Sequence, residues 1–229
     1  DLTPEKKRKQ SAAEELTNFN KSHNDTRNWN VVQLLLNHSD KNIDLNARED
    51  NVGATAFMFA CYKGHKDIVQ FLLDHSNPNI EVNAKTNILG MTAFMLACQN
   101  GQKDVVQLLL DSSNIEVNAT DNRGKTALMY ACIRGHKDVV QLLLDYSDPM
   151  IDLNARYNYG TTAFMIACQS GRQDIVQLFL ENSTKIELNA RDDYGKTALM
   201  RACKNGNIEV VQLLLNHSDI IIDLMSHYY

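Results

Sequence analysis

Several common sequence signals are missing from this chain of 229 residues. It has no run of about 18 apolar residues, so we expect no membrane-spanning helix. It also has no glycine-rich phosphate loop, no His-Glu-x-x-His and no Gly-x-Ser-x-Gly, which argues against an enzyme. The net charge of −5 is mild and does not by itself indicate a nucleic-acid partner.

Cysteine is scarce and unpaired. The five cysteines are an odd number and form no Cys-x-x-Cys, which argues against a disulfide framework and against a zinc site. With no recognisable signal peptide, free cysteines favour an intracellular protein of the cytoplasm or nucleus. The chain starts at Asp1 rather than at Met, so we expect it to be a piece of a longer protein.

Glycine is used sparingly and at fixed intervals. Two sets of five, each spaced by 37, 34, 36 and 35 residues, account for all ten glycines. The first set is Gly53, Gly90, Gly124, Gly160 and Gly195, and the second is Gly64, Gly101, Gly135, Gly171 and Gly206. Such self-similarity indicates a repeat protein in which glycine stands only where one recurring backbone shape needs it.

The residue pattern of each repeat predicts two helices and a projecting loop. Thr126 suits an N-cap, and Gly135 supplies a left-handed residue that ends the short first helix. The second helix, over 137–144, carries a broad apolar stripe of Val139, Val140, Leu143 and Leu144. The stretch 151–155 then alternates apolar and polar residues and leads to a turn, which is typical of a hairpin-like projection.

These residues resemble the ankyrin repeat. The match is close over Asp121 to Leu128 and again over Gly135 to Val140. The resemblance implies an all-α fold, a solenoid of stacked helix-turn-helix units with projecting β-hairpin loops. The sequence departs from the family pattern by placing Ala for its Pro, Met for its His, and Ser for the Gly that ends the second helix.

We expect the resemblance to cover residues 28–224. The predicted parts are a capping segment (1–27), a half repeat (28–47), five full repeats (48–84, 85–119, 120–155, 156–190 and 191–224) and a tail (225–229). The helix predicted over 3–20 contains the basic block Lys6-Lys7-Arg8-Lys9, which is either a nuclear localisation signal, a contact for an acidic partner, or a solvated helix face. Ile220-Ile221-Ile222 and Leu224-Met225 are apolar where a terminal repeat should be polar. Either the natural chain continues or the tail folds back as a strand-like lid, and we favour continuation.

The cysteines all occupy one place in the first helix: Cys61, Cys98, Cys132, Cys168 and Cys203. Stacked helices lie about 8–10 Å apart, too far for a disulfide, so we interpret them as small buried apolar groups. Cys61 with His65, and Cys132 with His136, also suggest a nucleophile and base. We favour the structural reading, because other units carry Gln102, Arg172 and Asn207 at the histidine position.

The resemblance implies that partners bind the concave face, formed by loop tips and the exposed flank of each first helix. The positions that this mapping selects are Arg48, Tyr62, Lys63, Lys85, Arg123, Lys125, Tyr130, Arg134, Arg156, Tyr157, Tyr159, Arg191, Tyr194, Lys196, Arg201 and Lys204. The mapped region holds eleven Lys or Arg against five acids: Glu49, Asp50, Asp121, Asp192 and Asp193.

Three functions are consistent with this surface. The first is a non-enzymatic scaffold that binds an acidic or phosphorylated protein segment, with Arg and Tyr as anchors. The second is an oligonucleotide or nucleotide sensor, with Tyr stacking on bases and Lys or Arg on phosphates. The third is a spacer in a longer array, in which the loop charges only keep the surface soluble. None of the three requires a cofactor, a metal or a membrane.

Overall fold

The computed structural model describes residues 44–74, 80–146 and 151–217. These ranges contain ten α-helices and one short 3-10 helix, and no β-strand is found within them. The predicted capping helix with its basic block at residues 6–9, most of the half repeat, and the apolar tail lie outside the described residues.

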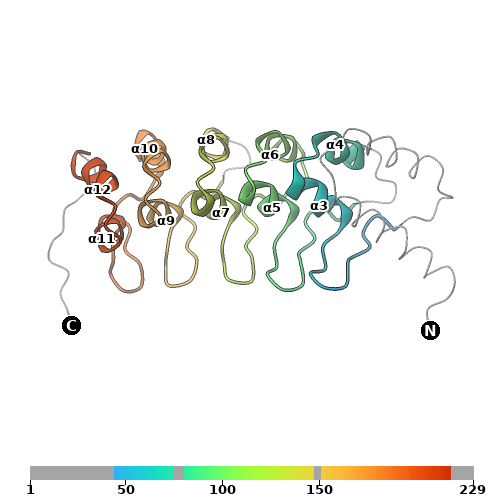
Figure 1. Cartoon of the computed structure of the whole chain (residues 1–229), viewed down its shortest axis with the longest axis horizontal. Helices are drawn as coiled ribbons and strands as arrows, with labels where there is room; N and C mark the ends of the chain where they lie inside the picture. The colour runs from blue at the N-terminus through green and yellow to red at the C-terminus, as the bar shows by residue number, and fades with distance from the viewer. Residues whose placement is uncertain (1–43, 75–79, 147–150, 218–229) are drawn as a thin grey trace. The chain divides into compact units, whose positions relative to one another are not determined.

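The helices alternate between a first and a second helix of each repeat (Figure 1). The first helices are α3 (Ala56–Lys63), α5 (Ala93–Gln99), α7 (Ala127–Arg134), α9 (Ala163–Gln169) and α11 (Ala198–Lys204). The second helices are α4 (Lys66–Asp74), α6 (Lys103–Leu110), α8 (Lys137–Asp145), α10 (Gln173–Glu181) and α12 (Ile208–Leu215). The 3-10 helix η1 (Ser183–Lys185) follows α10.

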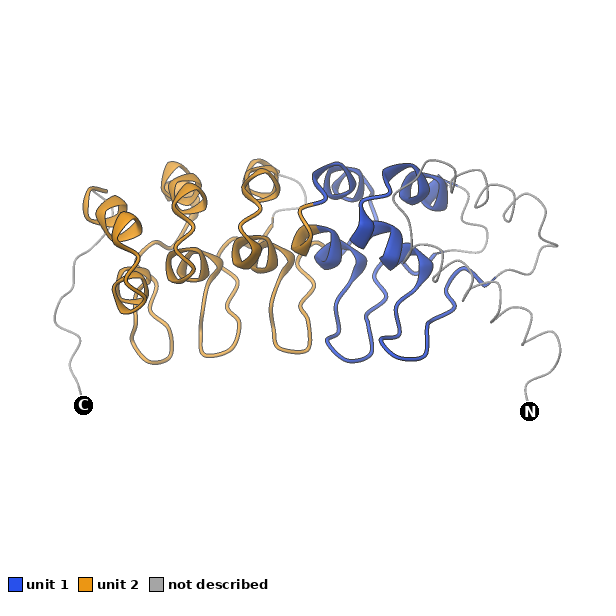
Figure 2. Ribbon diagram, viewed as in Figure 1, with its two compact units in different colours: residues 1–97, 102–116 blue, residues 98–101, 117–229 orange. Residues whose placement is uncertain are grey.

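The chain divides into two compact units (Figure 2): residues 1–97 with 102–116 form unit 1, and residues 98–101 with 117–229 form unit 2. Within unit 2, α9 contacts α7 and α11, while α10 contacts α8 and α12. Within unit 1, α4 contacts α6. Helices of the same kind therefore stack on each other, and the predicted all-α repeat fold is confirmed.

Local chemistry sets where the first helices begin and end. Thr126 lies before α7, and its hydroxyl accepts a hydrogen bond from the Met129 amide at 3.4 Å, as predicted. Thr55, Thr92, Thr162 and Thr197 do the same at 3.3 Å. Gly135 ends α7 with a φ of 83°, a left-handed conformation that favours glycine. All ten glycines have positive φ, so their regular spacing does mark one recurring backbone shape.

The core consists of apolar side chains from both helices of each pair. Val139, Val140, Leu143 and Leu144 are all buried, which confirms the predicted stripe of α8. Met129, which stands where the family pattern has His, is fully buried. Full burial of a side chain this size contributes about 1.5–3 kcal/mol, so packing replaces the hydrogen bonds that an imidazole would make.

The cysteines are buried with one exception. Cys61, Cys98, Cys132 and Cys168 are buried, as predicted, whereas Cys203 is exposed. The prediction is wrong for Cys203 because α11 belongs to the last helix pair that the structure describes. No described helix covers the far side of that pair.

Asparagine side chains join neighbouring repeats. The Oδ1 atoms of Asn46 and Asn83 accept hydrogen bonds from the amides of Glu81 and Glu116, both at 2.9 Å. In unit 2, Asn118 and Asn154 accept from the amides of Asp152 and Glu187, both at 2.8 Å. The recurrent Asn before Ala is therefore an interface residue between repeats.

The loops are tight hairpin turns whose length differs between the units. In unit 1 the closing hydrogen bonds join residues five apart, from Glu49 N to Ala54 O and from Thr86 N to Met91 O. In unit 2 they join residues four apart, as from Asp121 N to Lys125 O and from Asp192 N to Lys196 O. The hairpins include an isolated antiparallel bridge between Tyr157 and Thr161.

Candidate partner-binding surface

The predicted binding positions lie on the loops and first helices of both units, and each unit is considered by itself. Unit 1 contributes Arg48, Tyr62, Lys63 and Lys85. Unit 2 contributes Arg123, Lys125, Tyr130, Arg134, Arg156, Tyr157, Tyr159, Arg191, Tyr194, Lys196, Arg201 and Lys204. We call the second set, with the loops that carry it, the unit 2 surface.

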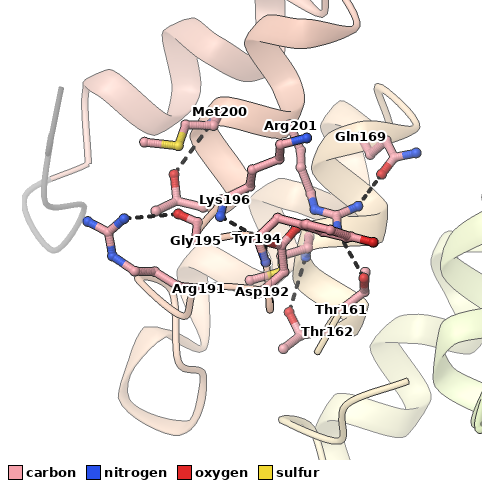
Figure 3. Close-up of polar contacts among 12 residues, drawn as sticks. Thr161, Thr162, Gln169, Arg191, Asp192, Tyr194, Gly195, Lys196, Met200 and Arg201 are labelled. Carbon is pink, nitrogen blue, oxygen red and sulfur yellow. Dashed lines mark hydrogen bonds and ion pairs between the residues drawn. The ribbon is translucent and has the colours of Figure 1, made fainter. Parts of the chain in front are cut away.

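Two acids of the unit 2 surface are buried and bonded internally. Asp121 accepts from the amides of Arg123 and Lys125 through Oδ1, at 2.8 and 2.7 Å. Asp192 accepts from the amides of Tyr194 and Lys196 in the same way, at 2.9 and 2.8 Å (Figure 3). Both carboxylates therefore fix the shape of their loops, and their side chains are turned away from solvent.

The second oxygen of each buried carboxylate bonds a residue nine positions later. Oδ2 of Asp121 accepts from the Tyr130 hydroxyl at 2.7 Å. Oδ2 of Asp192 accepts from Nη2 of Arg201 at 2.6 Å. One loop thus uses a neutral donor and the other a charged one at the same point of the repeat.

Tyr130 does not lie on an exposed flank, contrary to the prediction. Its exposed fraction is 7%, and the hydroxyl is bonded to Asp121. Burial first, and then the hydrogen bond to Asp121, raise the pKa of Tyr130 well above its ordinary value. The sequence prediction fails here because the tyrosine hydroxyl bonds a buried carboxylate of the preceding loop, which draws the side chain away from solvent.

Arg201 is also mostly buried, with 16% of its side chain exposed. Besides Asp192 it donates to Gln169 Oε1 at 2.5 Å and to Thr161 Oγ1 at 2.9 Å (Figure 3). Arg201 therefore ties α11 to the preceding repeat and is less available to a partner than predicted. Its Nε atom is buried and, among the described residues, has no hydrogen-bond acceptor.

The environment of Asp192 shifts its pKa. Burial alone would raise it, but hydrogen bonds from the Lys196 backbone, the Arg201 side chain and the Tyr194 backbone outweigh burial. The net result is a pKa below the ordinary value. Asp192 and Arg201 thus form a charged pair that needs no external partner.

Two further arginines link neighbouring loops. In unit 2, Arg156 donates to the Arg191 carbonyl at 2.9 Å and pairs with Glu187 at 3.3 Å. In unit 1, Arg48 donates to the Lys85 carbonyl at 2.6 Å. Both arginines are exposed, but their guanidinium groups already form hydrogen bonds with the next repeat.

The remaining cations of the unit 2 surface are exposed, except for Lys125, which is half-buried. Arg123, Arg134 and Lys204 are exposed, and none forms an ion pair with a described residue. Lys125 Nζ lies 5.1 Å from the centroid of the Tyr157 ring, and Lys196 Nζ lies 5.7 Å from that of Tyr194. Both ammonium groups are within cation–π distance of an aromatic ring.

The structure brings forward features that the sequence prediction missed. The loops of unit 1 carry exposed aliphatic side chains, Val52, Ile88 and Leu89. The sequence does contain an indication of these exposed residues: Ile88 and Leu89 come directly before Gly90, where turns usually have polar residues. In unit 2, Tyr159 has a φ of 61° and is the one described non-glycine residue with positive φ.

The nucleophile-and-base interpretation of the Cys–His pairs has no support in the geometry. Burial raises the pKa of the Cys61 and Cys132 thiols, whereas a nucleophilic cysteine needs a thiolate. His136 Nε2 donates to the Gln99 carbonyl at 2.9 Å, at the end of the preceding first helix. Gln102, Arg172 and Asn207 also donate to carbonyls of the preceding repeat. The position after the helix-ending glycine is therefore structural.

The described residues lack two further features. They contain no group of three or more His, Cys, Asp or Glu side chains placed to hold a metal ion. None of their helices is long and apolar enough to cross a membrane.

The stacked helix pairs and projecting loops define a helical-repeat protein, and comparison with family models specifies which one. The model for ankyrin repeats in three copies matches residues 22–86, 78–157, 112–192 and 148–225. The chain belongs to the ankyrin-repeat family, whose members generally act as protein-interaction modules and are typically not enzymes. A search of curated proteins finds no match.

Proposed function

We propose that this chain is a non-enzymatic binding module whose unit 2 surface captures an acidic or phosphorylated segment of a partner protein. The supporting observation is that acidic and basic side chains of this surface differ in burial. Asp121 and Asp192 are buried and internally bonded, whereas Arg123, Arg134 and Lys204 are exposed. Because Asp121 and Asp192 are buried and Asp193 is the remaining acid predicted on this surface, exposed bases outnumber exposed acids there, although the whole chain carries a net charge of −5.

Charge reversal on this surface tests the proposal. The probe is a fluorescein-labelled oligoglutamate peptide, followed by fluorescence anisotropy at low salt. The double variant Arg123→Glu/Arg134→Glu is expected to weaken binding by at least about tenfold, because like charges then face the probe. Neither side chain has a described ion pair to lose, so the melting temperature should stay close to that of the wild type.

The matched control is the double variant Lys137→Glu/Lys185→Glu, an equal change of charge at two exposed lysines outside the unit 2 surface, one at the start of α8 and one in η1. It should bind the probe nearly as well as the wild type. Equal weakening by the control, or no weakening by the double variant, would contradict the proposal. Tighter binding of a single-stranded RNA than of oligoglutamate would instead favour the oligonucleotide sensor.

The alternative of a spacer within a longer array makes a different prediction. A spacer should bind neither oligoglutamate nor RNA on this surface, even at low salt. Arg123 and Arg134 are exposed and form no ion pair with a described residue, which favours the binding function over the spacer.

A further inference from the structure

Two tyrosines from neighbouring loops of unit 2 form an exposed aromatic pair. The rings of Tyr159 and Tyr194 have centroids 5.3 Å apart and planes inclined by 41°. Their exposed fractions are 61% and 64%. Large aromatic side chains gain most by burial, so two of them left open side by side indicate an uncovered contact surface.

The backbone of Tyr159 is strained. A φ of 61° places a bulky residue in the left-handed region that glycine normally occupies. The conformation is held by neighbours, because the Tyr159 carbonyl accepts from the Asp193 amide at 3.0 Å. The fold thus sets this ring against Tyr194 at the tip of the loop.

The backbone at these tips offers little to a partner strand. The Asp193 amide is bonded to Tyr159, and the Tyr194 and Lys196 amides are bonded to Asp192. The Tyr157 and Thr161 amides donate to each other's carbonyls. A partner that binds by adding a β-strand needs free backbone groups, so the accessible chemistry is aromatic faces and side-chain charge.

The charge beside the rings is mainly positive. Lys196 lies against the Tyr194 ring, and Lys125 lies against Tyr157 in the next loop. Among the described residues of these loops, Asp193 is the exposed carboxylate, because Asp121 and Asp192 are buried. A partner segment here should therefore carry carboxylates near its apolar contact.

We infer that the Tyr159–Tyr194 pair is a docking site for an acidic, proline-containing segment of the partner in an extended polyproline II conformation. Such a segment has no internal hydrogen bonds, keeps its backbone solvated and needs no ladder partner. Its compact, rigid pyrrolidine rings pack against aromatic side chains. Its acidic residues would meet Lys125 and Lys196. This inference rests on the proposed function and specifies the chemistry of the partner.

Two labelled probes of equal charge test the inference by anisotropy: a peptide of Glu-Pro-Pro repeats and one of Glu-Ala-Ala repeats. We expect the wild type to bind the proline probe about tenfold more tightly, the size of a moderate interface anchor. Tyr159→Gly and Tyr194→Ala should abolish this preference. Tyr159→Phe and Tyr194→Phe should retain it, because the ring and not the hydroxyl makes the contact.

Tyr159→Gly is informative because glycine is relaxed at positive φ, so the variant should melt no lower than the wild type. Ile208→Ala is the control, since Ile208 is an exposed apolar residue of α12 that lies outside the predicted binding positions. It should leave the preference for proline unchanged.

The outcomes separate the two proposals. If the probes bind equally and Arg123→Glu/Arg134→Glu still weakens both, the acidic-partner function stands and the docking site is overturned. If neither probe binds, both are overturned. Single-stranded oligouridylate that binds more tightly than the proline probe, and loses affinity in Tyr159→Gly, would assign the pair to nucleic acid and overturn the inference.

Discussion

Two loops of unit 2 bury a carboxylate at the same point and give it different partners. Asp121 bonds the hydroxyl of Tyr130, and Asp192 bonds the guanidinium of Arg201, each nine residues later. The backbone hydrogen bonds that each carboxylate accepts are otherwise the same. The loop frame therefore depends on the carboxylate, while the repeat tolerates a neutral or a charged donor at the helix position.

The two pairs differ in what else they hold together. Arg201 reaches Gln169 and Thr161 of the preceding repeat, whereas the Tyr130 hydroxyl has one described bond, to Asp121. Arg201 therefore adds a link between repeats that Tyr130 lacks. The following predictions compare the two pairs.

Removal of the carboxylate should have the largest effect. Asp192→Ala leaves Arg201 without its charged partner and frees two loop amides, so we expect a loss of about 3–5 kcal/mol in unfolding free energy. Asp121→Ala should cost less, about 2–3 kcal/mol, because it leaves no buried cation behind. Urea unfolding measures both. An equal loss in the two variants would show that the charge of Arg201 is immaterial.

Removal of the donor should have a smaller effect. Arg201→Met keeps much of the packing but removes the ion pair and the link to Gln169 and Thr161, at a cost of about 2–3 kcal/mol. Tyr130→Phe removes one hydrogen bond to a carboxylate, at a cost of about 1–2 kcal/mol. Arg201→Tyr should recover part of the loss in Arg201→Met if the loop accepts either donor. If Arg201→Tyr loses as much stability as Arg201→Met, the loop does not accept either donor.

The pairs should respond to opposite ends of the pH range. The folded-state pKa of Asp192 is lowered, so its stabilisation is present above the ordinary value of 3.8 and is lost as pH falls through the folded pKa. The pKa of Tyr130 is raised, so its stabilisation is present below 10.0 and is lost as pH rises toward the folded pKa.

Thermal melting against pH checks this smallest effect. Asp192→Asn should lose less stability than the wild type on acidification below about pH 4. Tyr130→Phe should lose less above about pH 10. Parallel curves for a variant and the wild type at the relevant end would contradict the assignment of that pair.

The sequence predicts those parts of the fold that follow from local chemistry. The structure confirms three predictions that each depend on residues within one repeat: Thr126 as a cap, Gly135 as a left-handed stop and the apolar stripe of α8. Because the pattern recurs at fixed spacing, the same caps, stops and stripes are predicted in the other repeats.

The site was less predictable because exposure depends on distant neighbours. The sequence predicts that Tyr130 and Arg201 lie on an exposed helix flank. In the structure, each of them bonds a buried carboxylate nine residues earlier. Cys203 shares its pattern with four buried cysteines and is exposed because no described helix covers it. The ring pair of Tyr159 and Tyr194 depends on two loops 35 residues apart, a distance that no local pattern spans.

The asparagines between repeats have a consequence for measurement. The amides of Glu81, Glu116, Asp152 and Glu187 donate to a side chain of the preceding repeat and not to their own helix or loop. Hydrogen exchange at these four amides therefore follows the separation of one repeat from the next, even while each helix pair stays folded. They form a built-in set of reporters, one for each of these junctions, through which fraying along the array can be followed residue by residue.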